Sequence, residues 1–299
     1  MRNGGAYVVN LEFALRVAIF LSIAIVFSII YFRLSKKILG RFHLPQPTIL
    51  LGVASTVLGF LTLFAIFFVY VYHGFGYQPD IYRTGNRNSN KVALTFDDGP
   101  SEEFTLPILD ILRDYEVPAT FFMVGSHVER FPEVAKRVAE EGHAIGNHTQ
   151  THRNIPTLST IDLHREMMES TATILETTGV YPSYVRPPRG MYDDRFRRLS
   201  KLLGQEIVLW SISTRDWRYG VTSNYIVRFV DSKVRGGDII LFHDSGALLT
   251  NEGGDRRATV QSLPQVIELI RAKGLEIVPL SELLHDAPTE LFPQVDRPE

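Results

Sequence analysis

"ALTFDDGPS", residues Ala93 to Ser101, sets an apolar run directly against two carboxylates and a Gly-Pro pair. Neighbouring side chains of an extended strand point to opposite faces, so Asp97 and Asp98 can share a face only where a strand ends. Pro100 cannot continue a central strand. The doublet is therefore either an ordinary turn, for which Asp and Gly are common residues, or the edge of a functional site.

The amino-acid composition excludes several classes of protein and of functional site. The chain has 299 residues, of which 45% are hydrophobic, and a formal net charge of -2. These values fit a folded protein with a sizeable core and give no basic field that would indicate a nucleic-acid partner. The sequence contains no cysteine, which excludes disulfides, thiolate metal ligands and a cysteine nucleophile. Any metal ligand must come from His, Asp or Glu.

Two long apolar runs lie in the first quarter of the chain, at about 14–32 and 49–72. As helices they would be roughly 28 and 36 Å long, enough to cross a hydrocarbon core of about 30 Å. We therefore expect residues 1–72 to form a membrane anchor of two transmembrane helices in contact with the lipid bilayer. A cleaved signal peptide is the alternative for the first run, but no small-residue cleavage site follows it.

The connector between the two runs, 33–48, predicts the orientation of the anchor. It has no acidic residue, and its basic residues are Arg33, Lys36, Lys37 and Arg41. Positive charge favours the cytoplasmic side, so both termini are expected outside the cytoplasm. Basic residues after the second run argue more weakly for the opposite orientation. The predicted location is the cell membrane, multi-pass, with the large domain on the extracytoplasmic side.

Residues 73–90 read as a linker, 91–285 as a catalytic domain and 286–299 as a C-terminal tail. The domain alternates short apolar strands with helical patterns, which is typical of repeated βα units around a parallel sheet. The expected strands are 91–96, 119–125, 143–148, 183–188, 206–213, 238–243 and 275–280. The length is short for eight units, and no strand is followed by a phosphate-binding glycine fingerprint. An α/β fold with an incomplete or distorted βα barrel therefore fits best.

In such a barrel the chemistry lies where the strands end, at one rim. The polar residues that follow the predicted strands are Asp97, Asp98, His148, His152, Arg186, Arg189, Asp216, Trp217, His243 and Asp244. All of them should therefore meet at the same rim.

The segment "NHTQTH", 147–152, places two imidazoles four residues apart, which a helical turn or a tight loop can aim at one point. Such a pair also occurs by chance on solvated helices. With a carboxylate on the same rim, His148 and His152 form a three-ligand site with open positions, suited to zinc or another borderline divalent ion. Asp98 can then bind the metal while Asp97 accepts the proton of an attacking water.

Three further residues complete the predicted chemistry. Arg186 would hold Asp97 ionised and oriented. The alternative is an ordinary surface arginine beside a Pro-Pro turn. His243 would protonate the departing group, with Asp216 supporting its charged form. A buried structural histidine is the alternative for His243. The remaining histidines are interpreted as structural or exposed.

With these residues assembled, the chain resembles the polysaccharide deacetylases of carbohydrate esterase family 4, also called the NodB-homology domain, over about 91–285. The first motif, T-F-D-D-G, is present at Thr95–Gly99. The second, H-[ST]-x-x-H, matches His148–His152, and the third, R-x-P-x-G, matches Arg186–Gly190. The resemblance implies the same roles for Asp97, Asp98, the two histidines and Arg186. It also implies that the backbone N–H of Arg189 helps to hold the oxyanion.

The fourth and fifth motifs are matched less closely. The fourth usually reads D-x-x-D-W, but here it is "STRDW", with Ser213 at the first acidic position. Asp216 and Trp217 remain, and the resemblance implies that Trp217 forms a wall of the substrate pocket. In the fifth, "IILFH", it implies that Leu241 lines the pocket for the acetyl methyl group and that His243 is the acid. The change to Ser213 alters the polarity near that pocket.

The family implies a distorted (β/α)7 barrel and removal of N-acetyl groups from amino-sugar polymers with one divalent ion. Zinc is the first candidate, with cobalt, nickel and manganese as alternatives. The expected substrate is peptidoglycan, and chitin-like or poly-N-acetylglucosamine chains are the alternative. A non-catalytic glycan-binding relative and a non-haem iron oxygenase are rival interpretations, but neither needs both Asp97 and His243. The loop at 248–258 is expected to form one wall of the substrate groove, and the sequence leaves the oligomeric state open.

Overall fold

The structure, a computed structural model, describes residues 80–246 and 254–285 together with isolated helical positions between 19 and 64. The two predicted transmembrane runs, at 14–32 and 49–72, therefore lie largely outside the described residues. The tail at 286–299 and residues 248–253 of the predicted groove loop also lie outside them. No helix within the described part of the chain is both long enough and apolar enough to cross a membrane.

The chain divides into two compact units, and the sheet lies in the unit formed by 78–153, 164–190 and 197–299. This unit also contains every residue of the candidate site, so it is described by itself. Its strands are β1 (Ile81–Tyr82), β2 (Lys91–Asp97), β3 (Thr120–Met123), β4 (Ala144–Asn147), β5 (Tyr184–Val185), β6 (Glu206–Val208), β7 (Ile212–Ser213), β8 (Ile239–His243) and β9 (Glu276–Ile277).

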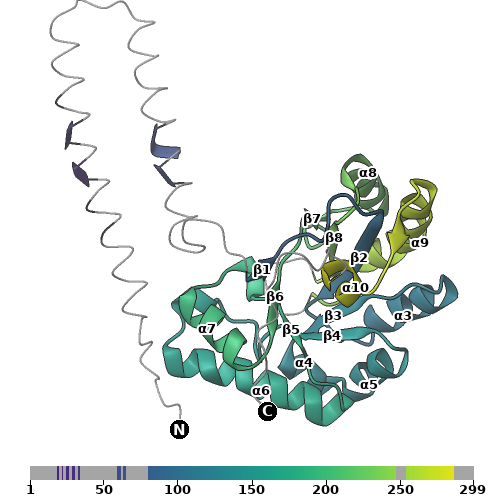
Figure 1. Cartoon of the computed structure of the whole chain (residues 1–299), viewed down its shortest axis with the longest axis horizontal. Coiled ribbons are helices and arrows are strands. Elements are labelled where there is room, and N and C mark those ends of the chain that lie inside the picture. The colour runs from purple at the N-terminus through teal and green to yellow at the C-terminus, as the bar shows by residue number, and fades with distance from the viewer. Residues whose placement is uncertain are drawn as a thin grey trace, which may run out of the picture. The chain divides into compact units, whose positions relative to one another are not determined.

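The sheet is parallel throughout its described ladders (Figure 1). Its strand order is β1-β6-β5-β4-β3-β2-β8-β7, and β9 pairs with β2 outside this order. The predicted parallel βα organisation is thus confirmed, and the curled sheet is consistent with a distorted (β/α)7 barrel. The helices that follow these strands are α3 (Thr105–Asp114), α4 (Gly125–Arg130), α5 (Pro132–Glu140), α6 (Thr160–Thr178), α7 (Asp194–Leu202), α8 (Ser223–Lys233), α9 (Arg257–Ala272) and α10 (Leu280–His285).

The sheet differs from the prediction in two places. The expected strand at 206–213 is split into β6 and β7, and β1 lies inside 73–90, the range expected to be a linker. The split has a tertiary cause, because the chain changes partners within this segment. The N–H of Leu209 donates to Tyr82 O over 2.7 Å, whereas the N–H of Ser211 donates to Ile239 O over 3.1 Å. The segment thus joins the two ends of the strand order.

Strand β2 separates the helical layer from the site. Phe96, on one face, stacks on Phe121 of β3 and Phe242 of β8 with ring centroids 5.0 and 5.6 Å apart. Val92, Leu94 and Phe96 belong to one buried apolar cluster with residues of α3, α8 and α9. Because side chains alternate along a strand, Thr95 and Asp97 point to the opposite face, toward the interior of the curled sheet.

Candidate active site

The Asp97–Asp98 doublet straddles the end of β2. Asp97 is the last residue of the strand and is paired in register with His243, the last residue of β8. Asp98 follows the strand with φ of 78°, a left-handed conformation that is uncommon for a residue other than glycine. Such backbone strain persists only where the surroundings hold it, and it clusters at functional sites. The turn therefore separates the two carboxylates and gives them different neighbours.

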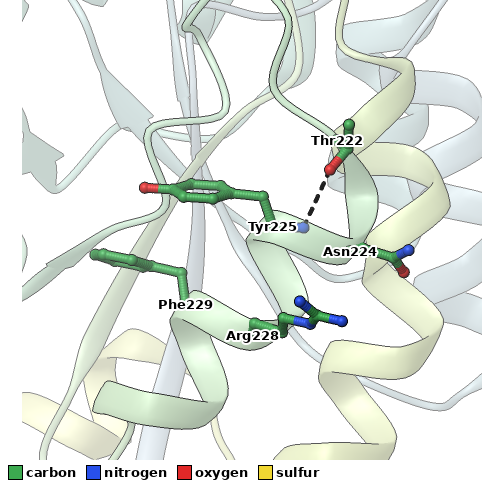
Figure 2. Close-up of a pocket in the computed structure, with 5 residues that line it drawn as sticks. All are labelled: Thr222, Asn224, Tyr225, Arg228 and Phe229. Atoms are coloured by element: carbon green, nitrogen blue, oxygen red, sulfur yellow. Dashed lines mark hydrogen bonds between the residues drawn. The ribbon is translucent and has the colours of Figure 1, made fainter.

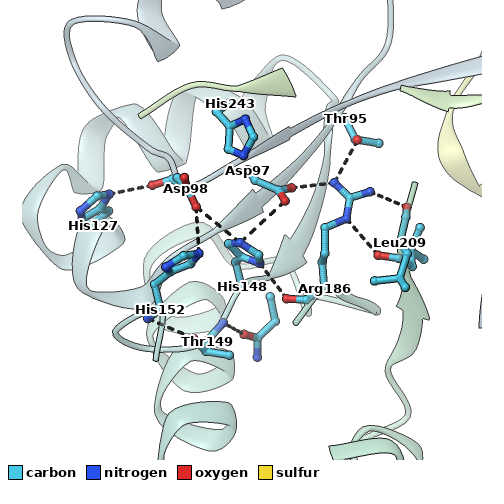
Figure 3. A network of polar contacts seen from close by, with 12 residues as sticks. Thr95, Asp97, Asp98, His127, His148, Thr149, His152, Arg186, Leu209 and His243 are labelled. Carbon is cyan, nitrogen blue, oxygen red and sulfur yellow. Dashed lines mark hydrogen bonds and ion pairs between the residues drawn. The ribbon is translucent and has the colours of Figure 1, made fainter. Parts of the chain in front are cut away.

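Asp98, His148 and His152 form a buried cluster (Figure 3). Asp98 Oδ1 lies 3.4 Å from His148 Nε2 and 3.3 Å from His152 Nε2. Ligand atoms that are each about 2.1 Å from a tetrahedral ion lie about 3.4 Å apart, so this spacing is that of three ligands around one centre. The cluster is a candidate metal site with two imidazoles and one carboxylate.

The hydrogen bonding of the cluster also fits a cation. His148 Nδ1 lies 2.7 Å from the carbonyl O of Arg186, which favours the tautomer with its proton on Nδ1 and leaves the Nε2 lone pair facing Asp98. Asp98 Oδ1 is buried and receives no hydrogen bond from the described residues. A buried carboxylate oxygen without a donor is costly unless a cation satisfies it. The donor set is therefore suited to a divalent ion.

The protonation states of Asp98 and His152 also fit a metal site. Burial acts to raise the pKa of Asp98, but the contact with His148 and the neighbouring imidazoles outweigh it, and the pKa lies well below its usual range. Burial lowers the pKa of His152 to about 3. At neutral pH the cluster thus presents a carboxylate and an uncharged His152 ring, which are the forms that bind metals.

A tight loop, and not a helical turn, aims the two histidines. Thr149 and His152 have φ of 68° and 55°. The side chain of Asn147 accepts a hydrogen bond from the Thr149 N–H over 2.7 Å, and the His152 N–H donates to Thr149 Oγ1 over 3.1 Å. These bonds fix the loop from its own polar side chains, and His148 and His152 therefore point to one place.

Arg186 lies next to Asp97 and is fully buried. Its Nη1 donates to Asp97 Oδ1 over 2.6 Å and to Thr95 Oγ1 over 3.0 Å. The other guanidinium nitrogens donate to the carbonyls of Val208 and Leu209, each over 2.9 Å. This planar group is thus held at several points, so that it fixes one oxygen of Asp97 and leaves Oδ2 directed at the cluster, 3.7 Å from His148 Nε2.

His243 and Asp216 form the second charged pair. His243 Nδ1 lies 2.7 Å from Asp216 Oδ1, while Asp216 Oδ2 accepts from the His243 N–H over 2.7 Å and from Thr259 Oγ1 over 2.8 Å. Burial disfavours a charged imidazole, but the Asp216 carboxylate outweighs it and raises the pKa of His243 to about 9. His243 is therefore protonated at neutral pH and can donate a proton.

The residues expected to contact substrate lie around these groups. Arg189 has φ of 58° and an exposed side chain. Its positive charge contributes to the lowered pKa of His152, after the larger effect of burial. Trp217 is 40% exposed, whereas Leu241 is buried in β8 and pairs in register with Ser213. The structure thus brings all the sequence-predicted residues to the strand ends, although the substrate roles of these three remain predictions.

Two further residues near the site have no role assigned from the sequence, although Asp244 was expected at the rim. His127, interpreted there as structural or exposed, is buried and its Nδ1 lies 2.7 Å from the backbone O of Asp98. Asp244 is buried behind the doublet, where its Oδ2 accepts from Thr105 Oγ1 over 2.7 Å. Burial raises the pKa of Asp244 to about 7. Both residues hold the turn that contains Asp98, since the Asp244 N–H donates to Asp97 O.

Comparison with known proteins identifies relatives of this domain. The sequence model of the polysaccharide deacetylase family matches residues 84–208. A peptidoglycan-N-acetylglucosamine deacetylase of Bacillus cereus is 38% identical over 200 residues, which cover 66% of this chain and 89% of that protein. A chitooligosaccharide deacetylase of a Bradyrhizobium species is 34% identical over 201 residues, which cover 65% of this chain and 91% of that protein.

Solved structures show the same fold. The crystal structure of the Bc1960 peptidoglycan N-acetylglucosamine deacetylase is 33% identical, with a TM-score of 0.65 over 73% of this chain and 96% of that chain. A pseudoenzyme of family CE4 from Bacillus anthracis is 25% identical, with a TM-score of 0.62 over 69% of each chain. On the strength of these relatives, the chain belongs to the polysaccharide deacetylase family and is a polysaccharide N-deacetylase.

Proposed function

We propose that the chain is a metal-dependent enzyme that removes N-acetyl groups from peptidoglycan outside the cytoplasm. The observation that carries this proposal is the arrangement of three groups at one rim: the Asp98–His148–His152 cluster, the Arg186-held Asp97, and the His243–Asp216 pair. One group can hold a cation, one can accept a proton and one can donate a proton. Amide hydrolysis needs all three functions.

Asp98, His148 and His152 would hold the ion, and the mixed N and O donors make zinc the first candidate, with cobalt, nickel or manganese as alternatives. When bound, such an ion polarises a carbonyl group and lowers the pKa of a water ligand. The set leaves coordination positions open, because the described residues contribute only three ligands to the cluster. Open positions distinguish catalytic from structural metal sites.

Asp97 is the proposed general base. Arg186 fixes its Oδ1 and so turns Oδ2 toward the cluster, where an attacking water would lie. The short contact with a buried, planar guanidinium fixes the orientation of the carboxylate that would accept the proton. The backbone N–H of Arg189, in its left-handed conformation, is the proposed donor to the oxyanion.

His243 is the proposed general acid. It is the register partner of Asp97 on the neighbouring strand, so acid and base lie side by side at the ends of adjacent strands. Its protonated ring can give a proton to the departing amine nitrogen, while Asp216 keeps the ring oriented from Nδ1. Trp217 and Leu241 are the proposed walls of the acetyl pocket, and Ser213, paired with Leu241, would make that pocket less acidic than usual.

The choice of peptidoglycan rests on the relatives. Proteins of Bacillus cereus and Listeria monocytogenes named peptidoglycan-N-acetylglucosamine deacetylases are 38% and 32% identical to this chain. Chitooligosaccharide deacetylases keep chitin-like chains as the alternative substrate. The anchor proposal draws support from apolar side chains at helical positions, since Ile25 and Phe60 are 59% and 61% exposed. Large exposed apolar side chains are what a membrane helix presents to lipid.

The test is acetate release by the purified full-length chain in detergent from acetylated peptidoglycan and from chitin oligomers, with and without a chelator. We expect release from peptidoglycan that stops on chelation and returns with zinc. Turnover that survives complete removal of metal would refute the metal dependence, and release from chitin alone would change the substrate. Protease added to intact cells should cut the catalytic domain, whereas protection of that domain would reverse the orientation.

A further inference from the structure

A surface hollow of about 430 Å³ lies along the first turns of α8 (Figure 2). It is lined by Thr222, Asn224, Tyr225, Arg228 and Phe229. Tyr225 and Phe229 are four residues apart on one side of the helix, and their rings are stacked with centroids 5.8 Å apart. Asn224 and Arg228, also four apart, form a polar ridge beside them. The hollow therefore combines a flat aromatic surface with a cation and an amide.

The segment that leads into α8 also exposes aromatic and basic side chains. Tyr219 is 97% exposed, and Trp217 is 40% exposed. Arg218 is exposed between them. Tyr219, which has almost no burial, contributes little to folding and is free to pack against a partner. We use the name α8 face for Arg218, Tyr219, Asn224, Tyr225, Arg228 and Phe229.

The α8 face connects to the active site through Arg215. The residue after it, Asp216, holds the proposed acid His243. The guanidinium of Arg215 lies 5.9 Å from the centre of the Phe229 ring, at the hollow. Arg215 also has φ of 58°, so the turn that places Asp216 at the site also sends the Arg215 side chain toward α8. The turn at Arg215 and Asp216 therefore joins the active site to the α8 face.

The α8 face and the neighbouring Arg215 carry exposed positive charge. In the described part of the protein no ion pair joins Arg215, Arg218 or Arg228 to a carboxylate, although each side chain is exposed. Several other arginines are paired with carboxylates, as in Arg113–Asp110, Arg137–Asp110, Arg197–Asp80 and Arg257–Asp255. The whole chain carries a net charge of -2. The three guanidiniums have no carboxylate partner among the described residues and are therefore available to an anionic partner.

We propose that the α8 face is a subsite for carboxylate-bearing sugar units of the same glycan strand whose acetyl group lies between Asp97 and His243. This inference rests on the proposed function and narrows its substrate to an anionic glycan. The tyrosine and phenylalanine rings pack on the apolar faces of sugar rings, and the guanidiniums bind carboxylates in a bidentate fashion. Peptidoglycan carries such carboxylates on its peptides, and on lactyl groups to which no peptide is attached, whereas chitin is neutral.

The test compares two soluble oligomers of equal length, a peptidoglycan fragment and a chitin fragment, with the full-length chain. The double variant R218Q/R228Q should raise the KM for the peptidoglycan fragment, relative to that for chitin, by about fivefold. Added salt should weaken the preference of the wild-type chain and have less effect on the variant. The variant Y219A/Y225A should raise the KM for both fragments, which separates stacking from charge. The matched control R113Q/R137Q removes two paired charges elsewhere and should leave the KM ratio unchanged.

Equal changes of KM on the two fragments, or a salt-independent preference in the wild-type chain, would overturn the inference. Its failure is distinguishable from failure of the proposed function by direct binding. Isothermal titration calorimetry of the wild-type chain and of R218Q/R228Q with both fragments measures the preference for the peptidoglycan fragment without turnover. If no acetate is released but the wild-type chain binds the peptidoglycan fragment about fivefold more tightly than the variant does, the proposed function fails and the subsite stands. Equal binding by the two chains refutes the subsite.

Discussion

Replacing Asp97 with Asn separates the proposed base from the proposed ligand beside it. All three ligand atoms belong to Asp98, His148 and His152, so the variant should keep its metal. An amide cannot accept the proton of the attacking water, and loss of a general base lowers the rate by about 10²- to 10⁴-fold. This corresponds to about 2.7–5.4 kcal/mol of lost transition-state stabilisation.

The cost to stability should be smaller than for most broken buried ion pairs. Removing one partner of such a pair costs about 3–5 kcal/mol when the other charge is left uncompensated. Here Arg186 keeps three acceptors, Thr95 Oγ1 and the carbonyls of Val208 and Leu209, and an asparagine oxygen can still accept from Nη1. We therefore expect a loss of about 1–3 kcal/mol, so that the variant remains folded.

The assay measures metal per chain by mass spectrometry beside acetate release, and thermal melting verifies the fold. Asp98→Asn is the matched control, because it makes the same chemical change one residue away. It should weaken metal binding, and added zinc should restore part of its rate. The reasoning is refuted if Asp97→Asn loses the ion while Asp98→Asn retains it, since the roles within the doublet would then be exchanged.

Three further predictions concern the acid, the metal and the anchor. Because the pKa of His243 is raised to about 9, activity should fall as the pH rises through that value, and Asp216→Asn should move this alkaline limb to lower pH, as a pH–rate profile would show. An unmoved limb would argue against His243 as the acid. His148→Ala and His152→Ala should each lose metal affinity together with rate, and full metal content in the double variant would exclude this site. A chain that begins at Gln78, before β1, should keep its turnover on soluble oligomers, and a folded but inactive truncation would show that the preceding residues contribute to catalysis.

Much of the site could be predicted because parallel strands bring their ends to one rim. Asp97, His148, Arg186 and His243 each lie at or just after a strand that the apolar pattern reveals. The side-chain types at this rim then limited which reactions the site could catalyse. What the pattern did not contain was the tight loop geometry at Thr149, which depends on hydrogen bonds from its own neighbours.

The missed features depend on contacts between distant segments. β1 has two residues, Ile81 and Tyr82, in a polar stretch, and it is a strand only because it pairs with residues 207–208. His127 meets the backbone of Asp98 across a separation of 29 residues. No local period or spacing encodes such a meeting, and only the assembled fold shows it.

The segment that joins the two ends of the sheet also supplies the carbonyls that hold Arg186. Val208 and Leu209 accept from this guanidinium, while the N–H groups of Leu209 and Ser211 donate to opposite ends of the strand order. Opening of this segment therefore also frees Arg186, which holds the proposed base Asp97, so the two changes are one cooperative event. The hydrogen-exchange protection of the Leu209 and Ser211 amides consequently measures the free energy of opening this segment. Substitutions elsewhere in the segment can lower activity without contacting a catalytic group.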